Sequence, residues 1–211
     1  MPKSKKPQIS ARKTPIQDRS TQIVDDILEA AIRVLIREGG ARFTTVRVAE
    51  EAGVSVGSLY QYFPNKTALL FRLQADEWTD TWSVLEEILD DEAYAPLDRL
   101  RRMVITFFRS ERQESALRSA LDEAGAPFRD SPEAAAHLQR AMKTIDRFMA
   151  AALPREKPER RRFYGEFMMT SLSSVAEKIT DERRSREEVD AWAKTSADMV
   201  CGYLRTLNGE I

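Results

Sequence analysis

The chain has 211 residues, 42% of them hydrophobic and 32% charged, a composition typical of a soluble globular protein with one or two domains. No apolar run reaches the ~18 residues that a membrane-spanning helix needs, and no apolar segment follows the basic N-terminus as in a signal peptide, so we expect a cytoplasmic protein with no membrane partner. A single cysteine and a single histidine exclude an intramolecular disulfide and make a cysteine/histidine metal site untenable, so we expect no metal and no cofactor.

Residues 1–19 are rich in Lys, Arg and Pro and hold almost nothing that could be buried, which predicts a disordered basic arm. Such an arm could contact DNA phosphates or the minor groove, or it could only aid solubility; the sequence leaves both open. Through Leu70 the chain carries 11 Lys and Arg against 7 Asp and Glu, whereas the remainder carries 22 against 27. The positive charge therefore gathers in the N-terminal third.

A helix is predicted from Ser20 or Thr21 to the glycines at positions 39 and 40, where the apolar periodicity stops. Its apolar residues form one stripe at helical spacing: Ile23, Ile27, Ala30, Ala31, Val34 and Leu35. We expect this helix to pack over the two short helices that follow it and to complete a three-helix head, with Phe43 sealing the joint.

The two short helices are delimited by caps and breakers. Thr44 can cap the first of them, and Gly53 stands just after its end near Ala52, where a left-handed residue usually stops a helix. Ser55 can cap the second helix, which ends before Pro64 because proline disfavours helical geometry in the residue that precedes it. In this second helix Val56, Leu59 and Phe63 share one face, and the other residues are free to contact a partner.

Two helices joined by a short turn that contains glycine form a helix-turn-helix unit, whose second helix enters the major groove of DNA. The exposed positions suit that use, because small residues allow close approach, Gln can pair with a base edge, and Thr, Tyr and Lys can bind phosphate oxygens. The predicted DNA-binding residues are Thr44, Thr45, Ser55, Val56, Gly57, Ser58, Tyr60, Gln61, Tyr62 and Lys66.

The run AEEAGVSVGSLYQYFPNKTALL resembles the DNA-binding helix-turn-helix of the tetracycline-repressor (TetR) family. The family pattern has an Ala-Gly-Val-Ser corner, a Leu-Tyr-x-x-Phe recognition helix and a Lys that opens the next helix. The likeness covers about residues 20–70, and corner, helix and cap agree in order and spacing. Beyond Leu70 only the family's general habit, a longer all-helical domain, is visible.

From Lys66 the helical pattern continues without a clear stop to about Ala93, further than a three-helix head needs. We therefore expect a connector helix whose far half packs against a second domain. The resemblance implies that this helix joins the DNA-binding head to a ligand-binding domain. The expected organisation is a disordered basic arm at 1–19, a helix-turn-helix DNA-binding domain at 20–66 and a helical effector-binding and dimerisation domain at 67–211.

Prolines and capping residues divide the second domain into five further helices. They are predicted to start at Pro96, at about Glu114, at Pro132, at Pro158 and after the capping box opened by Ser185. With no strand pattern anywhere, the sequence predicts an all-α fold of about nine helices: an N-terminal head, a long connector and a larger C-terminal domain.

The last two helices are apolar around much of their girth, which favours pairing with a second subunit, and the resemblance implies a homodimer at this place. The predicted interface residues are Phe163, Tyr164, Phe167, Met168, Trp192, Val200 and Tyr203. Such symmetry would let two heads read two half-sites of a palindrome.

The helices between Trp78 and Met149 are the expected place for a small-molecule cavity, although any single aromatic or Met residue is more often part of a packed core than of a ligand site. The mixture would favour an apolar or aromatic effector, with His137 or an Arg as a polar anchor. The candidate lining residues are Trp78, Trp82, Met103, Phe107, Phe108, Phe128, His137, Met142 and Phe148.

The resemblance implies a ligand-responsive transcriptional regulator, a repressor that binds a palindromic operator in double-stranded DNA as a homodimer and is released by an unknown small-molecule effector. Two alternatives stay open: a regulator without such a ligand, which activates or answers to a partner protein, and a helical interaction module. An enzyme is not supported, since there is no Gly-rich phosphate loop, no metal-spaced cluster and no His partner for Cys201.

Overall fold

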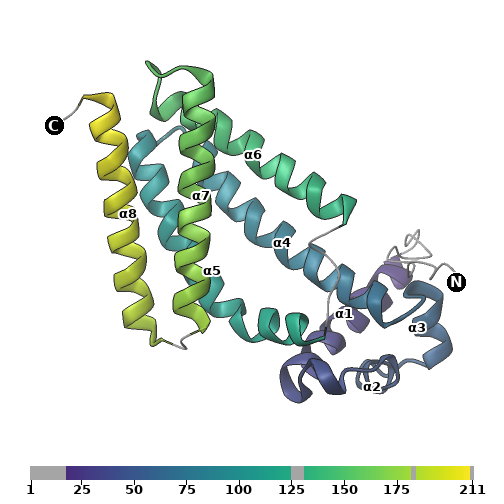
Figure 1. Cartoon of the computed structure of the whole chain (residues 1–211). Helices are drawn as coiled ribbons and strands as arrows, with labels where there is room; N and C mark the ends of the chain where they lie inside the picture. The colour runs from purple at the N-terminus through teal and green to yellow at the C-terminus, as the bar shows by residue number, and fades with distance from the viewer. Residues whose placement is uncertain (1–17, 125–130, 182–183, 210–211) are drawn as a thin grey trace, which may run out of the picture. The chain divides into compact units, whose positions relative to one another are not determined.

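The computed structural model describes residues 18–124, 131–181 and 184–209, and within these ranges the chain is helical with no strand (Figure 1). The α-helices are α1 (Asp18–Glu38), α2 (Thr45–Glu51), α3 (Val56–Tyr62), α4 (Lys66–Asp90), α5 (Pro96–Glu123), α6 (Pro132–Ala152), α7 (Pro158–Asp181) and α8 (Arg186–Asn208). A 3-10 turn, η1 (Gly40–Arg42), joins α1 to α2. The predicted all-α fold with an N-terminal helix-turn-helix is confirmed. The predicted basic arm lies outside the described residues, apart from its last two.

One predicted break is wrong. The sequence predicted separate helices starting at Pro96 and at about Glu114, but α5 runs without interruption from Pro96 to Glu123. The intervening residues include no Gly or Pro, and Ser110 and Ser115 satisfy their hydroxyl groups within the helix by donating to backbone carbonyls of the preceding turn at 2.9 Å. Nothing therefore stops α5 at this point, and the described part of the chain holds eight α-helices instead of about nine.

The chain divides into two compact units, and the divisions fall inside α4 and α5. Unit 1 comprises residues 1–77 and 116–134, and unit 2 comprises residues 78–115 and 135–211. The end of α5 thus belongs to the same unit as the three-helix head. The assignment of 67–211 to effector binding and dimerisation stays a prediction.

The core of unit 1 is built by α1, the two short helices, the first part of α4 and the end of α5. The predicted stripe of α1 is buried in it except for the half-buried Ile23, and Phe43, Leu59 and Phe63 are buried there too. Helix α5 adds Ala120 and Leu121. Gly40 lets α5 lie directly against η1, because a Cβ atom at residue 40 would lie 2.4 Å from the backbone nitrogen of Ala124. The backbone N–H of Gly40 also donates to Glu123 Oε2 at 2.9 Å.

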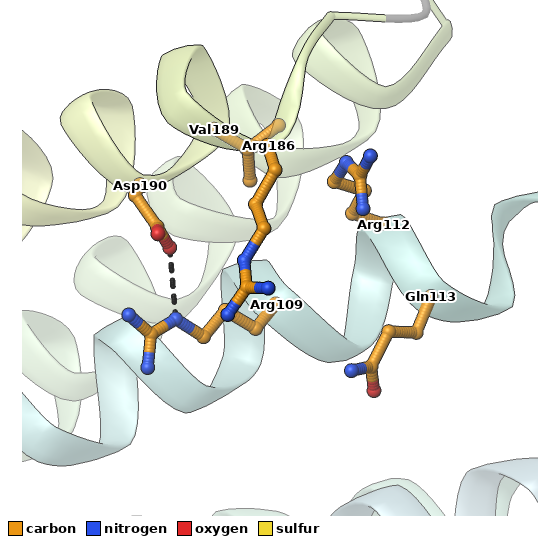
Figure 2. A pocket seen from close by; sticks show the side chains of 6 residues that line it. All are labelled: Arg109, Arg112, Gln113, Arg186, Val189 and Asp190. Atoms are coloured by element: carbon orange, nitrogen blue, oxygen red, sulfur yellow. Dashed lines mark hydrogen bonds and ion pairs between the residues drawn. The ribbon is translucent and has the colours of Figure 1, made fainter.

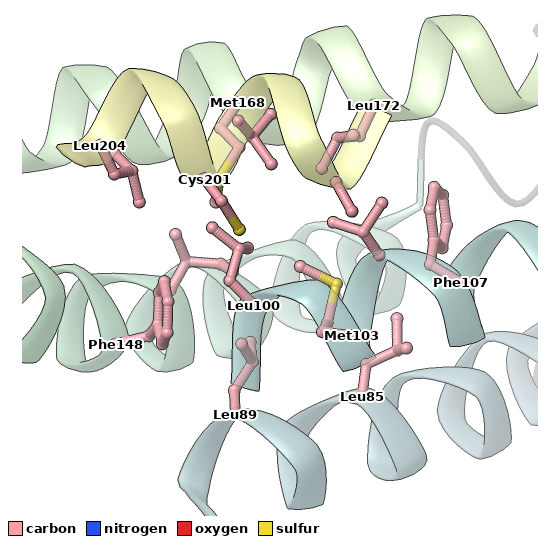
Figure 3. Close-up of a cluster of buried hydrophobic side chains, with 14 of the residues drawn as sticks. Leu85, Leu89, Leu100, Met103, Phe107, Phe148, Met168, Leu172, Cys201 and Leu204 are labelled. Atoms are coloured by element: carbon pink, nitrogen blue, oxygen red, sulfur yellow. The ribbon is translucent and has the colours of Figure 1, made fainter. Parts of the chain in front are cut away.

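The core of unit 2 gathers side chains from α4 to α8 (Figure 3). Leu100, Met103 and Phe108 of α5 are fully buried in it, and so is Met149 of α6. The single cysteine, Cys201, lies in this core, and burial raises the pKa of its thiol. None of the described helices combines the length and the apolar character that crossing a membrane requires.

Candidate nucleic-acid interface

The corner between α2 and α3 has the geometry that its sequence predicts. Thr44 caps α2 by accepting a hydrogen bond from the Arg47 backbone N–H at 3.3 Å. Gly53 follows with a φ of 66°, in the left-handed region, where an L side chain would be strained. The backbone N–H of Val54 then returns to the Ala49 carbonyl at 3.0 Å, which closes the turn. The corner is therefore fixed by backbone hydrogen bonds and by a left-handed backbone conformation that favours glycine.

Helix α3 is oriented by its cap and its buried face. The Ser55 Oγ accepts from the Ser58 backbone N–H at 3.0 Å and lies 2.8 Å from the Ser58 Oγ. Leu59 and Phe63 are 0% and 1% exposed, so one face of α3 is anchored in the core of unit 1. The opposite face is consequently directed outward.

The structure spreads the predicted DNA-binding residues over several environments. Thr44, Ser55, Gly57, Tyr60 and Gln61 are exposed on the outer side of the corner and α3. The rest of the set on α3 is half-buried and comprises Val56, Ser58 and Tyr62. The exposed part of the set thus extends from the cap of α2 to the last turn of α3.

Two of the predicted residues are engaged within the protein. Thr45 is buried, and its Oγ1 lies 3.0 Å from the Tyr60 hydroxyl, so Thr45 positions the Tyr60 ring. Lys66 is half-buried, its Nζ donates to the Gly40 carbonyl at 3.3 Å, and it lies 5.6 Å from the centroid of the Phe43 ring. Both residues stabilise the shape of the face, in addition to any contact with a phosphate.

Two exposed cations, Arg42 and Arg47, were missed by the sequence analysis, although both flank the cap at Thr44. Arg47 lies in the first turn of α2 and pairs with Glu38, while Arg33 and Arg37 both bind Glu51, at 3.1 and 2.8 Å. Hydrogen bonds from Arg37 and then Arg33 lower the pKa of Glu51. The signal that could have identified them is a basic residue next to the cap of a helix-turn-helix, a position suited to phosphate contact.

Two family models match this chain over most of its length. Residues 27–73 match the model for bacterial regulatory proteins of the tetR family, and residues 95–207 match the model for the tetracyclin repressor-like C-terminal domain. This chain belongs to the TetR family. The matched family and the shared fold are those of transcriptional regulators, not of enzymes.

Proteins similar in sequence to this chain align with it over different fractions of their length. The HTH-type transcriptional repressor KstR of Rhodococcus jostii is 32% identical over 133 residues, 63% of this chain and 60% of KstR. The nucleoid occlusion factor SlmA of Aliivibrio fischeri is 36% identical over 80 residues, 37% of this chain and 39% of SlmA. This chain thus matches less than two thirds of the length of either relative.

Solved structures share the fold over nearly the whole chain. The fatty acid degradation regulator FadR from Bacillus halodurans has a TM-score of 0.66 at 19% identity, covering 92% of this chain and 98% of FadR. SmeT, the repressor of the Stenotrophomonas maltophilia multidrug efflux pump SmeDEF, has a TM-score of 0.63 at 21% identity, covering 87% of this chain and 88% of SmeT.

In the C-terminal part of this TetR-family protein, most of the predicted effector-binding residues lie in packed surroundings. Met103, Phe107, Phe108 and Phe148 are buried in the core of unit 2, Trp82, His137 and Met142 are half-buried, and Trp78 is 36% exposed. Phe128 lies outside the described residues. A pocket of about 120 Å³ does open between α5 and α8, but none of the described candidates lines it (Figure 2).

The predicted interface residues divide by exposure. Phe163, Phe167, Trp192 and Tyr203 are between 40% and 61% exposed on α7 and α8. The other three, Tyr164, Met168 and Val200, are buried in the core of unit 2. The exposed members include two stacked rings, since the centroids of Phe163 and Phe167 lie 6.3 Å apart.

Proposed function

We propose that this TetR-family protein is a transcriptional repressor that binds a palindromic operator in double-stranded DNA as a homodimer and is released by a small-molecule effector. The observation that carries the proposal is the two-sided character of α3. Its inner residues Leu59 and Phe63 are almost fully buried, while Gly57, Tyr60 and Gln61 are exposed on a helix anchored by two caps. A short, rigid helix with a small and polar outer face suits insertion into a major groove.

The chemistry of this face assigns different roles to its residues. Gln61 can form a bidentate pair with a base edge, which gives sequence preference. Tyr60, held by Thr45, and the exposed Arg42 and Arg47 can bind phosphate oxygens, which fixes the register of the helix on the duplex. Gly57 adds no side chain, so the start of α3 can come close to the DNA.

The homodimer is supported by the exposed aromatic face of α7 and α8. Phe163, Phe167, Trp192 and Tyr203 would leave four large apolar side chains in water, whereas a second copy could cover them as one half of a four-helix contact. Phe163→Asp and Phe167→Asp should each convert the dimer to a monomer in sedimentation velocity. Leu138→Asp is the matched control, because Leu138 is 61% exposed, as Phe163 is, yet lies on α6 and not on α7 or α8.

An effector site is supported by the polar groups that α4 and α6 bring into unit 2. Within the described residues the buried Nε1 of Trp82 meets no hydrogen-bond acceptor, so an acceptor on a ligand would satisfy it. His137 lies 3.4 Å from the Thr79 hydroxyl, and desolvation, followed by the charge of Arg140, lowers the pKa of its imidazole. A neutral histidine and a free indole donor suit an uncharged, largely apolar effector.

Effector binding would then release the DNA by changing the arrangement of α4. A structural neighbour, FadR from Bacillus subtilis, was solved in complex with stearoyl-CoA, which supports small-molecule binding by proteins of this fold. Since α4 contributes residues to both units, an effector that prefers one arrangement of α4 would bias the spacing of the two recognition helices. The size of the effect is limited by the difference in effector affinity between the two arrangements.

The test is selection of duplexes from a random-sequence library by the full chain, followed by binding measurements over a range of salt concentrations. We expect enriched sequences with two-fold symmetry and an affinity that falls linearly with the logarithm of salt concentration. Gln61→Ala should relax base preference, with a loss of about 1–3 kcal/mol of discrimination at one position of each half-site. Gln139→Ala, an exposed glutamine on α6, is the control and should bind like the parent. Absence of any enriched sequence and of any salt dependence would favour a protein-interaction module.

A further inference from the structure

A second cationic site lies in unit 2, which contains none of the residues assigned to DNA. The pocket between α5 and α8 is lined by Arg109, Arg112 and Gln113 of α5 and by Arg186, Val189 and Asp190 of α8 (Figure 2). Its volume is about 120 Å³, room for several water molecules or for one tetrahedral oxyanion. Arg109 and Arg112 are neighbours on α5, whereas Arg186 lies on α8, far away in sequence, so the fold brings the third arginine to the other two.

The charges of this pocket do not balance. Arg109 Nε donates to Asp190 Oδ1 at 2.8 Å, and this pair consumes the one carboxylate of the lining. Arg112 and Arg186 act on Asp190 through space, and with Arg109 they lower the pKa of that carboxyl. Three guanidinium groups against one carboxylate leave two positive charges on the wall of a small concave surface.

The chemistry of the lining suits a phosphate group. Guanidinium groups present planar pairs of donors that match phosphate oxygens, and Arg112 and Arg186 reach the pocket from different helices. Figure 2 shows Arg186 pointing from α8 towards α5, with the amide of Gln113 on the same helix as Arg112. Val189, which is 1% exposed, provides an apolar surface beside the cations. A dianion neutralises two positive charges, whereas a monocarboxylate or a phosphodiester neutralises one.

We propose that the pocket formed by Arg109, Arg112 and Arg186 is a binding site for a dianionic phosphate, either free phosphate or the phosphomonoester group of a small molecule. The site is independent of the proposed DNA face, since every lining residue belongs to unit 2. Arg112 and Arg186 bind the anion directly, and Asp190 holds Arg109 in place at its edge.

Calorimetric titration of the full chain without DNA tests the proposal, at pH 7.5 and constant ionic strength. The probes are inorganic phosphate, phenyl phosphate and dimethyl phosphate, because the first two are mainly dianionic at this pH and the third is a monoanion. We expect saturable binding of at least one dianion, with dimethyl phosphate at least tenfold weaker. Tighter binding of phenyl phosphate than of inorganic phosphate would assign the site to a phosphomonoester, and the reverse would assign it to the free ion.

Variants locate the binding. The double substitution Arg112→Gln and Arg186→Gln should weaken dianion binding at least tenfold, and Arg112→Lys should weaken it less, because the charge is kept while the planar donor pair is lost. Arg205→Gln, which removes one exposed cation from the other end of α8, is the control and should stay within twofold of the parent. The proposal is overturned if neither dianion binds, if the double variant binds as the parent does, or if the control loses as much affinity as the double variant. Because no DNA is present, failure here leaves the proposed repressor function standing.

Discussion

The close contact between α5 and η1 predicts that Gly40→Ala destabilises the head more than the same change at any other glycine that the structure describes in unit 1. A Cβ atom at residue 40 would lie 2.4 Å from Ala124 N, 2.5 Å from Ala120 O and 2.8 Å from Glu123 C, all of which are backbone atoms. No side-chain rotation can relieve these contacts. The last turn of α5 would have to retreat by about 1 Å to restore ordinary van der Waals separation, and buried residues of unit 1 would move with it.

The magnitude follows from two losses. Overpacking of a rigid contact costs about 1–3 kcal/mol, and loss of the charge-assisted hydrogen bond from Gly40 N to Glu123 Oε2 costs about 1.5–3 kcal/mol. The gain from a less flexible unfolded chain, about 0.4–1 kcal/mol, offsets part of this. We therefore expect a net loss of about 2–5 kcal/mol in the free energy of unfolding, seen as a fall in the melting temperature by circular dichroism of about 5–15 °C.

Two controls separate the contact from other effects. Gly53→Ala introduces left-handed strain at a φ of 66° but meets no atom within 4 Å, so it should cost only about 1–2 kcal/mol. Glu123→Ala removes the hydrogen bond without adding an atom and should fall between the parent and Gly40→Ala. Equal melting temperatures for Gly40→Ala and the parent would refute the close contact between η1 and the last turn of α5.

Three further predictions concern other contacts. Arg118→Leu should lower the free energy of unfolding by about 3–5 kcal/mol in chemical denaturation, because Glu77, whose side chain is 5% exposed, loses the guanidinium that donates to it at 2.5 and 2.8 Å. Gly165→Ala should cost about 1–3 kcal/mol in the same assay, since its Cβ would lie 2.7 Å from Ile145 Cγ2, a stiff branched position. Thr45→Val should weaken DNA binding in gel shift with little change in melting temperature, because the Tyr60 hydroxyl loses its partner at 3.0 Å but remains exposed to water.

The sequence was sufficient for the head because its signals are local. Thr44 and Ser55 cap the helices that they were expected to cap, and Gly53 adopts the left-handed turn. Asn65 caps α4 in the same way, since its Oδ1 accepts from Ala68 N at 2.8 Å. A cap needs only its own helix, so it can be recognised from a few residues. The continuity of α5 was missed because it carries no such local signal: a helix continues wherever no Gly, Pro or capping residue stops it.

The candidate sites were less predictable because exposure depends on tertiary packing. Tyr164 and Phe163 are adjacent and chemically alike, yet one is 6% exposed and the other 61%. Thr45 and Lys66 have the right chemistry for phosphate, but each also has a partner within the head that is distant in sequence. The arginine pocket forms because α8 brings Arg186 close to Arg109 and Arg112 of α5, and no local sequence pattern predicts that two distant helices pack together at this point.

The continuity of α5 also changes how a signal could pass through this protein. The sequence suggested α4 as the connector, but two helices contribute to both cores: α4 supplies Leu70 and Leu89, and α5 supplies Met103 and Leu121. Arg112, on the wall of the phosphate pocket, and Glu123, which binds the Gly40 backbone, stand on the same uninterrupted helix. A helix transmits a displacement along its axis because its backbone hydrogen bonds resist shortening. A ligand bound to α5 would therefore shift the equilibrium between two arrangements of the head only if it bound one placement of this helix more tightly than the other. Its total affinity would not matter.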